Sequence, residues 1–154
     1  MNRVLDFMGK DHDRLDKIFK EFKKIKNKDF DKVKSLFSQF KTGLQRHIVW
    51  EEEILFILFE ERTGLVDGGP TEVMRMEHRQ IKKFLHEIHE KIERQDTQTD
   101  NLEYGLVEVL TNHNYKEENI LYPWIDKELN EEEINDAFKK MSNLPSEKYE
   151  NCCE

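Results

Sequence analysis

Apolar residues recur every three or four positions over four long stretches of the chain, which is the period of one helix face. These stretches run from Val4 to Ile25, Phe30 to Glu61, Pro70 to Arg94 and Leu102 to Glu128. Only short polar or glycine-containing segments separate them, and short connections make consecutive helices antiparallel neighbours. The pattern therefore predicts an all-α, up-down-up-down, antiparallel four-helix bundle.

Helix-breaking and helix-capping residues refine this prediction. Pro70 suits the first turn of the third helix, where its missing N–H costs nothing, whereas Pro123 inside the fourth stretch predicts a kink or a restart. Asn130 precedes three glutamates, which predicts a capped, short C-terminal fifth helix ending near residue 141. We expect one domain over residues 1–141 and a flexible tail over residues 142–154.

Composition excludes several classes of function. The 154 residues include 38% charged side chains and carry a net charge of −8, and the basic run Lys17–Lys28 is interrupted by apolar residues at helical spacing. A nucleic-acid surface needs clustered basic residues, so no nucleic-acid partner is expected. No apolar run approaches the ~20 residues of a membrane span, and the first residues do not resemble a signal peptide. The sequence thus favours a cytoplasmic protein without membrane contact.

The two cysteines, Cys152 and Cys153, are adjacent near the end of the chain. Adjacent cysteines bridge each other only with strain, and a tail pair cannot staple a core. They are interpreted as reduced thiols without a structural role, with a contact to metal or to a redox partner as the alternative.

Each of the four predicted helices carries a histidine in the middle of its apolar stripe. These residues are His12, His47, His78 and His113. A buried imidazole needs partners for both ring nitrogens, so four such residues predict a polar cluster within the bundle. Two glutamates, Glu51 and Glu117, follow a histidine by four residues and lie on the same stripes, where an unpaired carboxylate would be costly.

Depth along the bundle separates these residues from the other histidines. Counted from one end of the bundle, the four histidines and two glutamates agree within roughly two helical turns. His89 lies about 16 Å deeper than His78, and His86 is turned away by about 80°. We expect both to be solvent-facing or paired with Glu90 and Glu93.

Imidazoles and carboxylates from facing helices are typical of non-haem metal centres in helical bundles. A carboxylate can bridge two cations, so two glutamates among four histidines favour two metal ions. Mixed nitrogen and oxygen ligands suit iron or manganese, whereas zinc sites more often use fewer ligands or thiolates. A bundle whose histidines are purely structural is the alternative.

At these residues the chain resembles the hemerythrin-like family, the HHE cation-binding domain, over about residues 1–141. The resemblance is carried by KDHDRL around His12, HIVWEEEILF from His47, GGPTEVMRMEH ending at His78 and HNYKEENILYPW from His113. It implies an oxo- or hydroxo-bridged centre of two iron ions, with manganese or zinc disfavoured. The implied ligands are His12, His47, Glu51, His78, His113 and Glu117.

The chain departs from the oxygen-carrying members of that family at two positions. Lys82 stands where they have a second histidine on the third helix. Glu118, preceded by Glu117, stands where they usually have an aspartate five residues after the fourth-helix histidine. A protonated lysine cannot ligate iron, which would leave a position open to water, peroxide or NO.

The leading hypothesis is a non-haem di-iron protein that binds O2, NO or peroxide as a carrier, sensor or scavenger. A metal-sensing regulatory module and a di-iron enzyme acting on peroxide or NO are the alternatives. The sequence contains no independent nucleophile or phosphate-binding loop, so any catalysis would depend on the metals, and it identifies no protein partner.

Overall fold

The computed structural model describes residues 3–150, and its regular structure is helical. The helices are α1 (Val4–Ile25), α2 (Phe30–Trp50), α3 (Phe56–Thr63), α4 (Pro70–Glu93), α5 (Asp100–Lys116), α6 (Tyr122–Glu128) and α7 (Glu131–Ser142). Two π-helical segments, η1 (Glu51–Leu55) and η2 (Glu117–Leu121), and a short 3-10 turn, η3 (Ser146–Lys148), complete the set. Cys152 and Cys153 lie outside the described residues. No helix within residues 3–150 is long and apolar enough to span a membrane.

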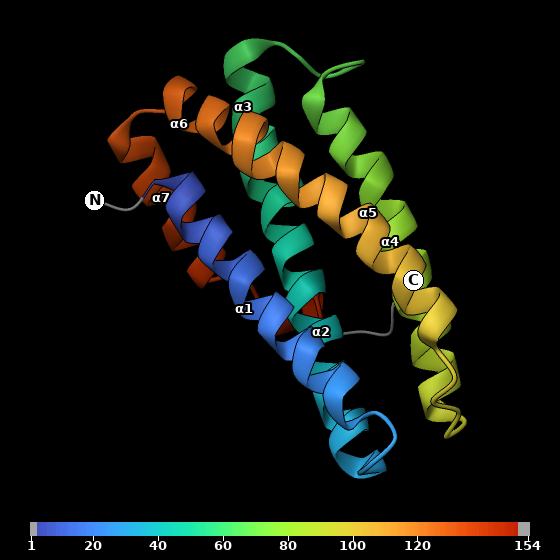
Figure 1. The fold of residues 1–154 in the computed structure, drawn as a ribbon. Coiled ribbons are helices and arrows are strands. Elements are labelled where there is room, and N and C mark those ends of the chain that lie inside the picture. Colours follow the sequence, from blue (N-terminus) through green and yellow to red (C-terminus); the bar gives the residue numbers. More distant parts are fainter. Residues whose placement is uncertain (1–2, 151–154) are drawn as a thin grey trace.

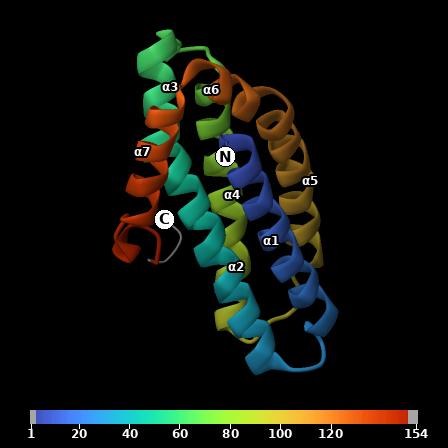
Figure 2. The same cartoon turned by 90° about the vertical axis from the view of Figure 1, so that its left-hand side faces the viewer.

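Four rods form the predicted antiparallel bundle (Figures 1 and 2). Two rods are α1 and α4, the third joins α2, η1 and α3 without a break, and the fourth joins α5, η2 and α6. The expected interruption near Pro123 is present, because α6 begins at Tyr122 directly after the π-helical segment η2. Four of the five predicted helices thus form the bundle, and the fifth, α7, packs beside η1.

Local signals place the helix ends. Gly64 adopts a left-handed conformation at the end of α3, with φ of 74°, and Pro70 occupies the first turn of α4. The Asn130 side chain accepts a hydrogen bond from the Glu133 backbone N–H, and the Glu133 side chain bonds back to Asn130. This reciprocal cap confirms the start of the predicted fifth helix.

The apolar core is divided into two layers with polar residues between them. The first layer lies near the chain's N-terminus and includes Met8, Phe56, Phe59, Tyr122 and Ile134, all fully buried. The second lies towards the α1–α2 turn and includes Phe22, Phe37, Ile81, Leu85 and Leu106. The polar residues between the layers, called the polar level below, include His12, which lies between Met8 and Leu15 on α1.

Two glycines bring the rods together in pairs. A Cβ atom on Gly43 of α2 would lie 2.7 Å from a Leu15 methyl carbon of α1, and one on Gly105 of α5 would lie 2.7 Å from the Phe84 ring of α4. Such distances are too short for packed carbon atoms, so glycine permits these approaches. The α1–α2 and α4–α5 pairs are therefore close-packed.

A buried ion pair joins the α1–α2 helix pair to the α4–α5 helix pair at the end of the bundle away from the polar level. Lys26 follows α1 and is 6% exposed, and its ammonium bonds the carboxylates of Asp100 and Glu103 at the start of α5. Glu103 is 3% exposed and also accepts a bond from the Thr99 hydroxyl. The pair compensates a carboxylate that would otherwise be buried alone.

Replacing Lys26 by methionine should destabilise the fold by about 3 kcal/mol, because the Glu103 carboxylate loses its buried counter-charge. Thermal unfolding should show a melting temperature lowered by roughly 6–12 °C. Lys24→Met serves as the matched control, since that side chain is 76% exposed. The double variant K26M/E103L should recover most of the loss. Equal melting temperatures for K26M and K24M would contradict the prediction.

Candidate metal centre

Both glutamates of the predicted cluster lie where a rod changes from α-helical to π-helical bonding. The Phe56 backbone N–H donates to the Glu51 carbonyl, and the Tyr122 N–H donates to the Glu117 carbonyl, five residues back in each case. Each π turn holds one residue more than an α turn, and such turns are frequent at functional sites. The residues after each glutamate are consequently rotated relative to a uniform α-helix.

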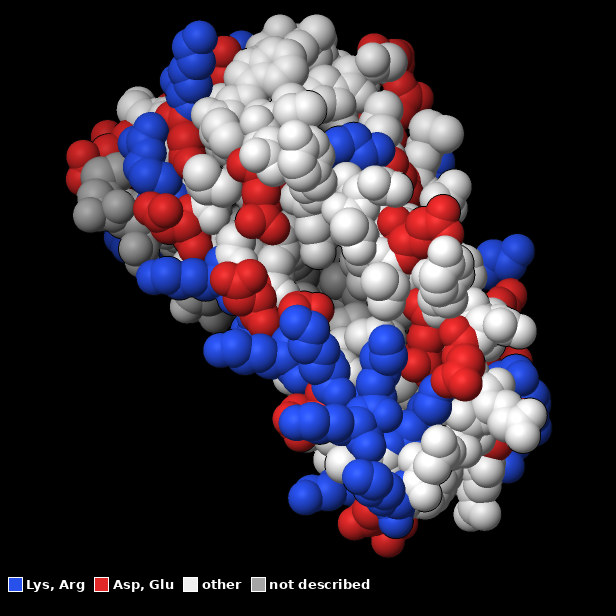
Figure 3. Space-filling view, in the orientation of Figure 1, with Lys and Arg blue, Asp and Glu red and all other residues white. Residues whose placement is uncertain are grey.

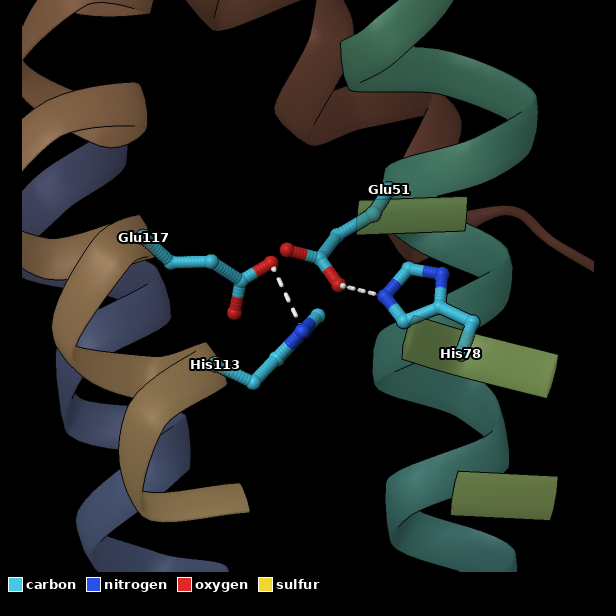
Figure 4. A group of neighbouring side chains, drawn as sticks. All are labelled: Glu51, His78, His113 and Glu117. Carbon is cyan, nitrogen blue, oxygen red and sulfur yellow. Dashed lines mark hydrogen bonds and ion pairs between the residues drawn. The ribbon is translucent and has the colours of Figure 1, made fainter. Parts of the chain in front are cut away.

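The structure brings all six predicted residues together at the polar level. Glu51, His78, His113 and Glu117 form one group of candidate donors, and His12, His47 and Glu117 form a second. Within each group the candidate donor atoms lie within 4.8 Å of one another. All six side chains are buried, with both glutamates completely inaccessible. Figure 4 shows the first group, in which the two carboxylates point towards each other between the rods.

The imidazoles are arranged as two pairs that flank the carboxylates. The ring centroids of His12 and His47 are 4.6 Å apart, and those of His78 and His113 are 4.9 Å apart. The Nε2 atoms face the carboxylates: His12–Glu117 is 3.1 Å, His78–Glu51 is 3.1 Å, His113–Glu117 is 3.3 Å and His47–Glu51 is 3.8 Å. The arrangement presents four ring nitrogens and two carboxylates to one small volume.

Each histidine directs its other ring nitrogen, Nδ1, at a second carboxylate further out. The pairs are His12–Glu118 (2.9 Å), His47–Asp11 (2.8 Å), His78–Glu52 (2.6 Å) and His113–Glu77 (2.8 Å). A carboxylate that accepts from Nδ1–H sets the tautomer and leaves the Nε2 lone pair for a metal, as in the carboxylate–histidine pairs of known metal sites. All four imidazoles are thus oriented for ligation.

Sequence reasoning missed this outer set of carboxylates. Glu52 and Glu118 are only partly exposed, and each contacts a ring of the cluster. Asp11 is 8% exposed, and Arg14 holds it at 2.9 Å. Burial by itself raises the pKa of the Asp11 carboxyl, but bonds to His47 and Arg14 outweigh it and lower that pKa. The position of Asp11 directly before His12 in the sequence could have indicated that this carboxylate belongs to the cluster.

Tyr122 is a central residue of the site that periodicity does not reveal. In a uniform α-helix it would lie ~180° around from His113, and the extra residue of η2 rotates it back by ~100°. Its hydroxyl lies 2.7 Å from Glu51 Oε2, 3.0 Å from Glu117 Oε1 and 3.0 Å from His47 Nε2. Burial and the two carboxylate charges raise the pKa of this phenol well above its usual value. It therefore keeps its proton at neutral pH.

Charge compensation within the cluster shifts the protonation of the histidines. Burial lowers the pKa of His12, but the hydrogen bond to Glu117 and the charges of Glu117 and Glu51 outweigh it and raise that pKa to about 9. At His78 burial is likewise outweighed by bonds to Glu51 and Glu52, and its pKa rises to about 9. Burial raises the pKa of Glu51. Burial acts in the same direction at Glu117, but the charge of His113 and hydrogen bonds with Glu51, His113 and His12 outweigh it and hold the pKa of Glu117 well below its usual value.

The donor set fits a metal ion. Within the described residues, Glu117 Oε2 is a buried carboxylate oxygen that accepts no hydrogen bond, although His113 Nε2 lies 3.3 Å away as an ion pair. A buried carboxylate oxygen without a donor is costly unless a cation compensates it. The converging imidazole and carboxylate groups can bind such a cation, and each imidazole is already held by its outer carboxylate.

The remaining histidines lie outside both donor groups. His86 is 42% exposed and contacts Glu90 at 3.2 Å, in agreement with the expected surface pairing. Burial and the charge of Lys41 lower the pKa of His89. Lys82 is half-buried on α4, and its charge helps to lower the pKa of the Glu52 carboxyl, whose burial acts in the opposite direction. It thus acts on the outer carboxylate of His78.

Comparison with known proteins agrees with this geometry. The model of the hemerythrin HHE cation-binding domain matches residues 3–125. The chain belongs to the hemerythrin HHE family. An uncharacterized hemerythrin-like protein of Schizosaccharomyces pombe is 31% identical over 133 residues, which covers 86% of this chain and 64% of that protein. The chain therefore spans less than two thirds of that relative. No solved structure matches it.

The hemerythrin-like cluster gives metal-free protein a characteristic pH dependence. A folded-state pKa of about 9 at His12 and His78, against 6.5 for free histidine, stabilises the fold fully below pH 6.5. This contribution is lost as the pH rises through 9. We expect the melting temperature in chelator, followed by circular dichroism, to fall by at least about 5 °C between pH 6.5 and pH 9. Metal-loaded protein should lack this decline. A flat curve for the metal-free protein would refute the raised pKa values of His12 and His78.

Glu77→Gln should weaken metal binding about 10–100-fold, because the neutral amide no longer polarises the His113 ring. Competition with a chromophoric chelator measures the affinity. Glu90→Gln is the matched control, since it alters a histidine–glutamate pair on the same helix but outside the cluster. Equal affinities for the two variants would show that the Glu77 carboxylate does not position the site.

Proposed function

We propose that the chain is a non-haem di-iron protein that binds O2, NO or a peroxide as a carrier, sensor or scavenger. The observation that carries the proposal is the pair of overlapping donor groups, which share Glu117 between two imidazole pairs. Each group supplies both nitrogen and oxygen donors, a mixture that suits iron better than zinc. The proposed ligands are His12, His47, Glu51, His78, His113 and Glu117.

Two ions account for the arrangement better than one. The donors divide into a His78–His113 side and a His12–His47 side, with the carboxylates between them. A carboxylate in that position can bridge two cations, as in the di-iron carboxylate proteins built in helical bundles. When bound, two iron ions would supply the capacity to bind O2, NO or peroxide and to exchange electrons with it.

The protein's own residues would control access to that centre. The outer carboxylates orient the imidazoles, and the apolar layers on either side exclude water. Tyr122 holds a proton within hydrogen-bonding distance of both central carboxylates, where it can donate to an oxygen atom at the site. These features support ligand binding in a dry pocket with one fixed proton donor.

Anaerobically purified protein should contain about two iron ions per chain and develop a near-ultraviolet charge-transfer band in air. Metal analysis and absorption spectroscopy measure both. His78→Asn should lose at least half of the iron and the band, because a donor of one group is removed. His86→Asn, on the same helix but outside the cluster, should retain both, and circular dichroism checks that both variants are helical. Less than one iron per chain in the wild type, with no band, would overturn the proposal.

A further inference from the structure

The α1 rod and the rod formed by α5, η2 and α6 are joined by hydrogen bonds at two places. Between these two places they lie further apart. Near the metal centre His12 of α1 bonds Glu117 and Glu118, and at the far end Lys26 bonds Asp100 and Glu103. Between these places the two helices diverge (Figure 1), because the close approaches at Gly43 and Gly105 draw α1 onto α2 and α5 onto α4. Figure 3 shows a hollow in this part of the surface.

The hollow leads into a cavity whose inner part is apolar. Its wall includes Leu15, Phe19, Phe40, Leu44, Val107 and Leu110, from three helices. His12 also lines it, so the cavity reaches a proposed metal ligand. Val107 is 38% exposed and stands at the rim, whereas Phe40 is 2% exposed and lies deep in the core.

The cavity is larger than a diatomic molecule requires. Its volume is about 90 Å³. One water molecule needs only about 10–15 Å³, and the opening beside Val107 lets part of a larger molecule extend towards the surface. The apolar part of the wall favours a compact organic molecule over water.

Charge in and around the cavity favours a neutral occupant. Among the described residues of its wall, Asp16 is the acidic one. The Glu118 carboxylate lies close by, where it bonds the His12 ring. The lysines Lys17, Lys20, Lys23 and Lys24 border a separate surface hollow, and Lys20 is paired with Asp16 at 2.9 Å. Burying a second carboxylate between these apolar side chains and beside Asp16 would be costly. The uncharged polar groups, Thr111 and Asn114, are available for one hydroxyl-like group.

We propose that the cavity between α1 and α5 binds a small neutral organic molecule with a compact apolar body and one hydroxyl-like group. The apolar body fills the space between Phe19, Phe40 and Leu110, and the polar group faces Thr111 and Asn114. This inference deepens the proposed function, and it rests on that function only in taking His12 as a metal ligand. An organic molecule would then bind beside the metal centre, in addition to any diatomic gas bound there.

Calorimetric titration of the metal-containing protein with cyclohexanol tests the proposal. Cyclohexanol is neutral, has seven non-hydrogen atoms and carries one hydroxyl. We expect saturable binding at one site per chain. Leu110→Phe should weaken that binding at least tenfold by filling the cavity. Leu102→Phe is the matched control, because Leu102 is a partly buried leucine of the same helix that does not line the cavity.

Val107→Trp provides a second blocked variant at an exposed rim position that should fold normally, and it should also weaken binding at least tenfold. Cyclohexanecarboxylate is the charged probe, and we expect it to bind at least tenfold more weakly than cyclohexanol. Absence of saturable cyclohexanol binding, equal binding by V107W and wild type, or tighter binding of the carboxylate would each overturn the proposal.

Metal analysis of the same samples separates this inference from the proposed function. Protein that contains iron but binds no cyclohexanol would refute the organic ligand and leave the di-iron centre standing. Protein that lacks iron but binds cyclohexanol, with the binding blocked by V107W, would refute the di-iron function and support the cavity.

Discussion

The burial of two carboxylates and four imidazoles at one level of a narrow bundle is the constraint on which the rest of the structure depends. Buried polar groups need partners, and here the inner ones partner one another while the outer ring nitrogens reach four further carboxylates. Arg14 and Lys116 in turn neutralise two of those carboxylates, Asp11 and Glu77. The polar level is therefore a connected network that continues to the protein surface.

The helices adapt to this network by local changes in their hydrogen bonding. A π turn begins at each central glutamate, so the rods place different faces towards the core above and below the polar level. Tyr122 reaches the centre for this reason and supplies its one phenolic proton. The same network ties α1 to the α5–α6 rod at His12, and the close helix pairs leave a cavity below that contact.

Much of the fold was predictable because its determinants are local. Apolar periodicity located α1 and α4 to within one residue at each end, and the Asn130 cap located α7. The six central residues were predictable because each interrupts an apolar stripe at a similar depth. Sequence reasoning failed at residues whose position depends on the π turns or on neighbouring helices. These are Tyr122, Asp11, Glu52, Glu77 and Glu118.

By itself the sequence determined four amphipathic helices, their antiparallel order and the level at which histidine and glutamate meet, since these follow from residue spacing along single helices. Only the tertiary structure decided which nitrogen of each imidazole faces inward, which carboxylate holds the other, and that α1 and α5 enclose a cavity beside His12. The reason is physical: periodicity specifies a face of one helix, whereas hydrogen-bond partners and cavities arise from the distances between helices.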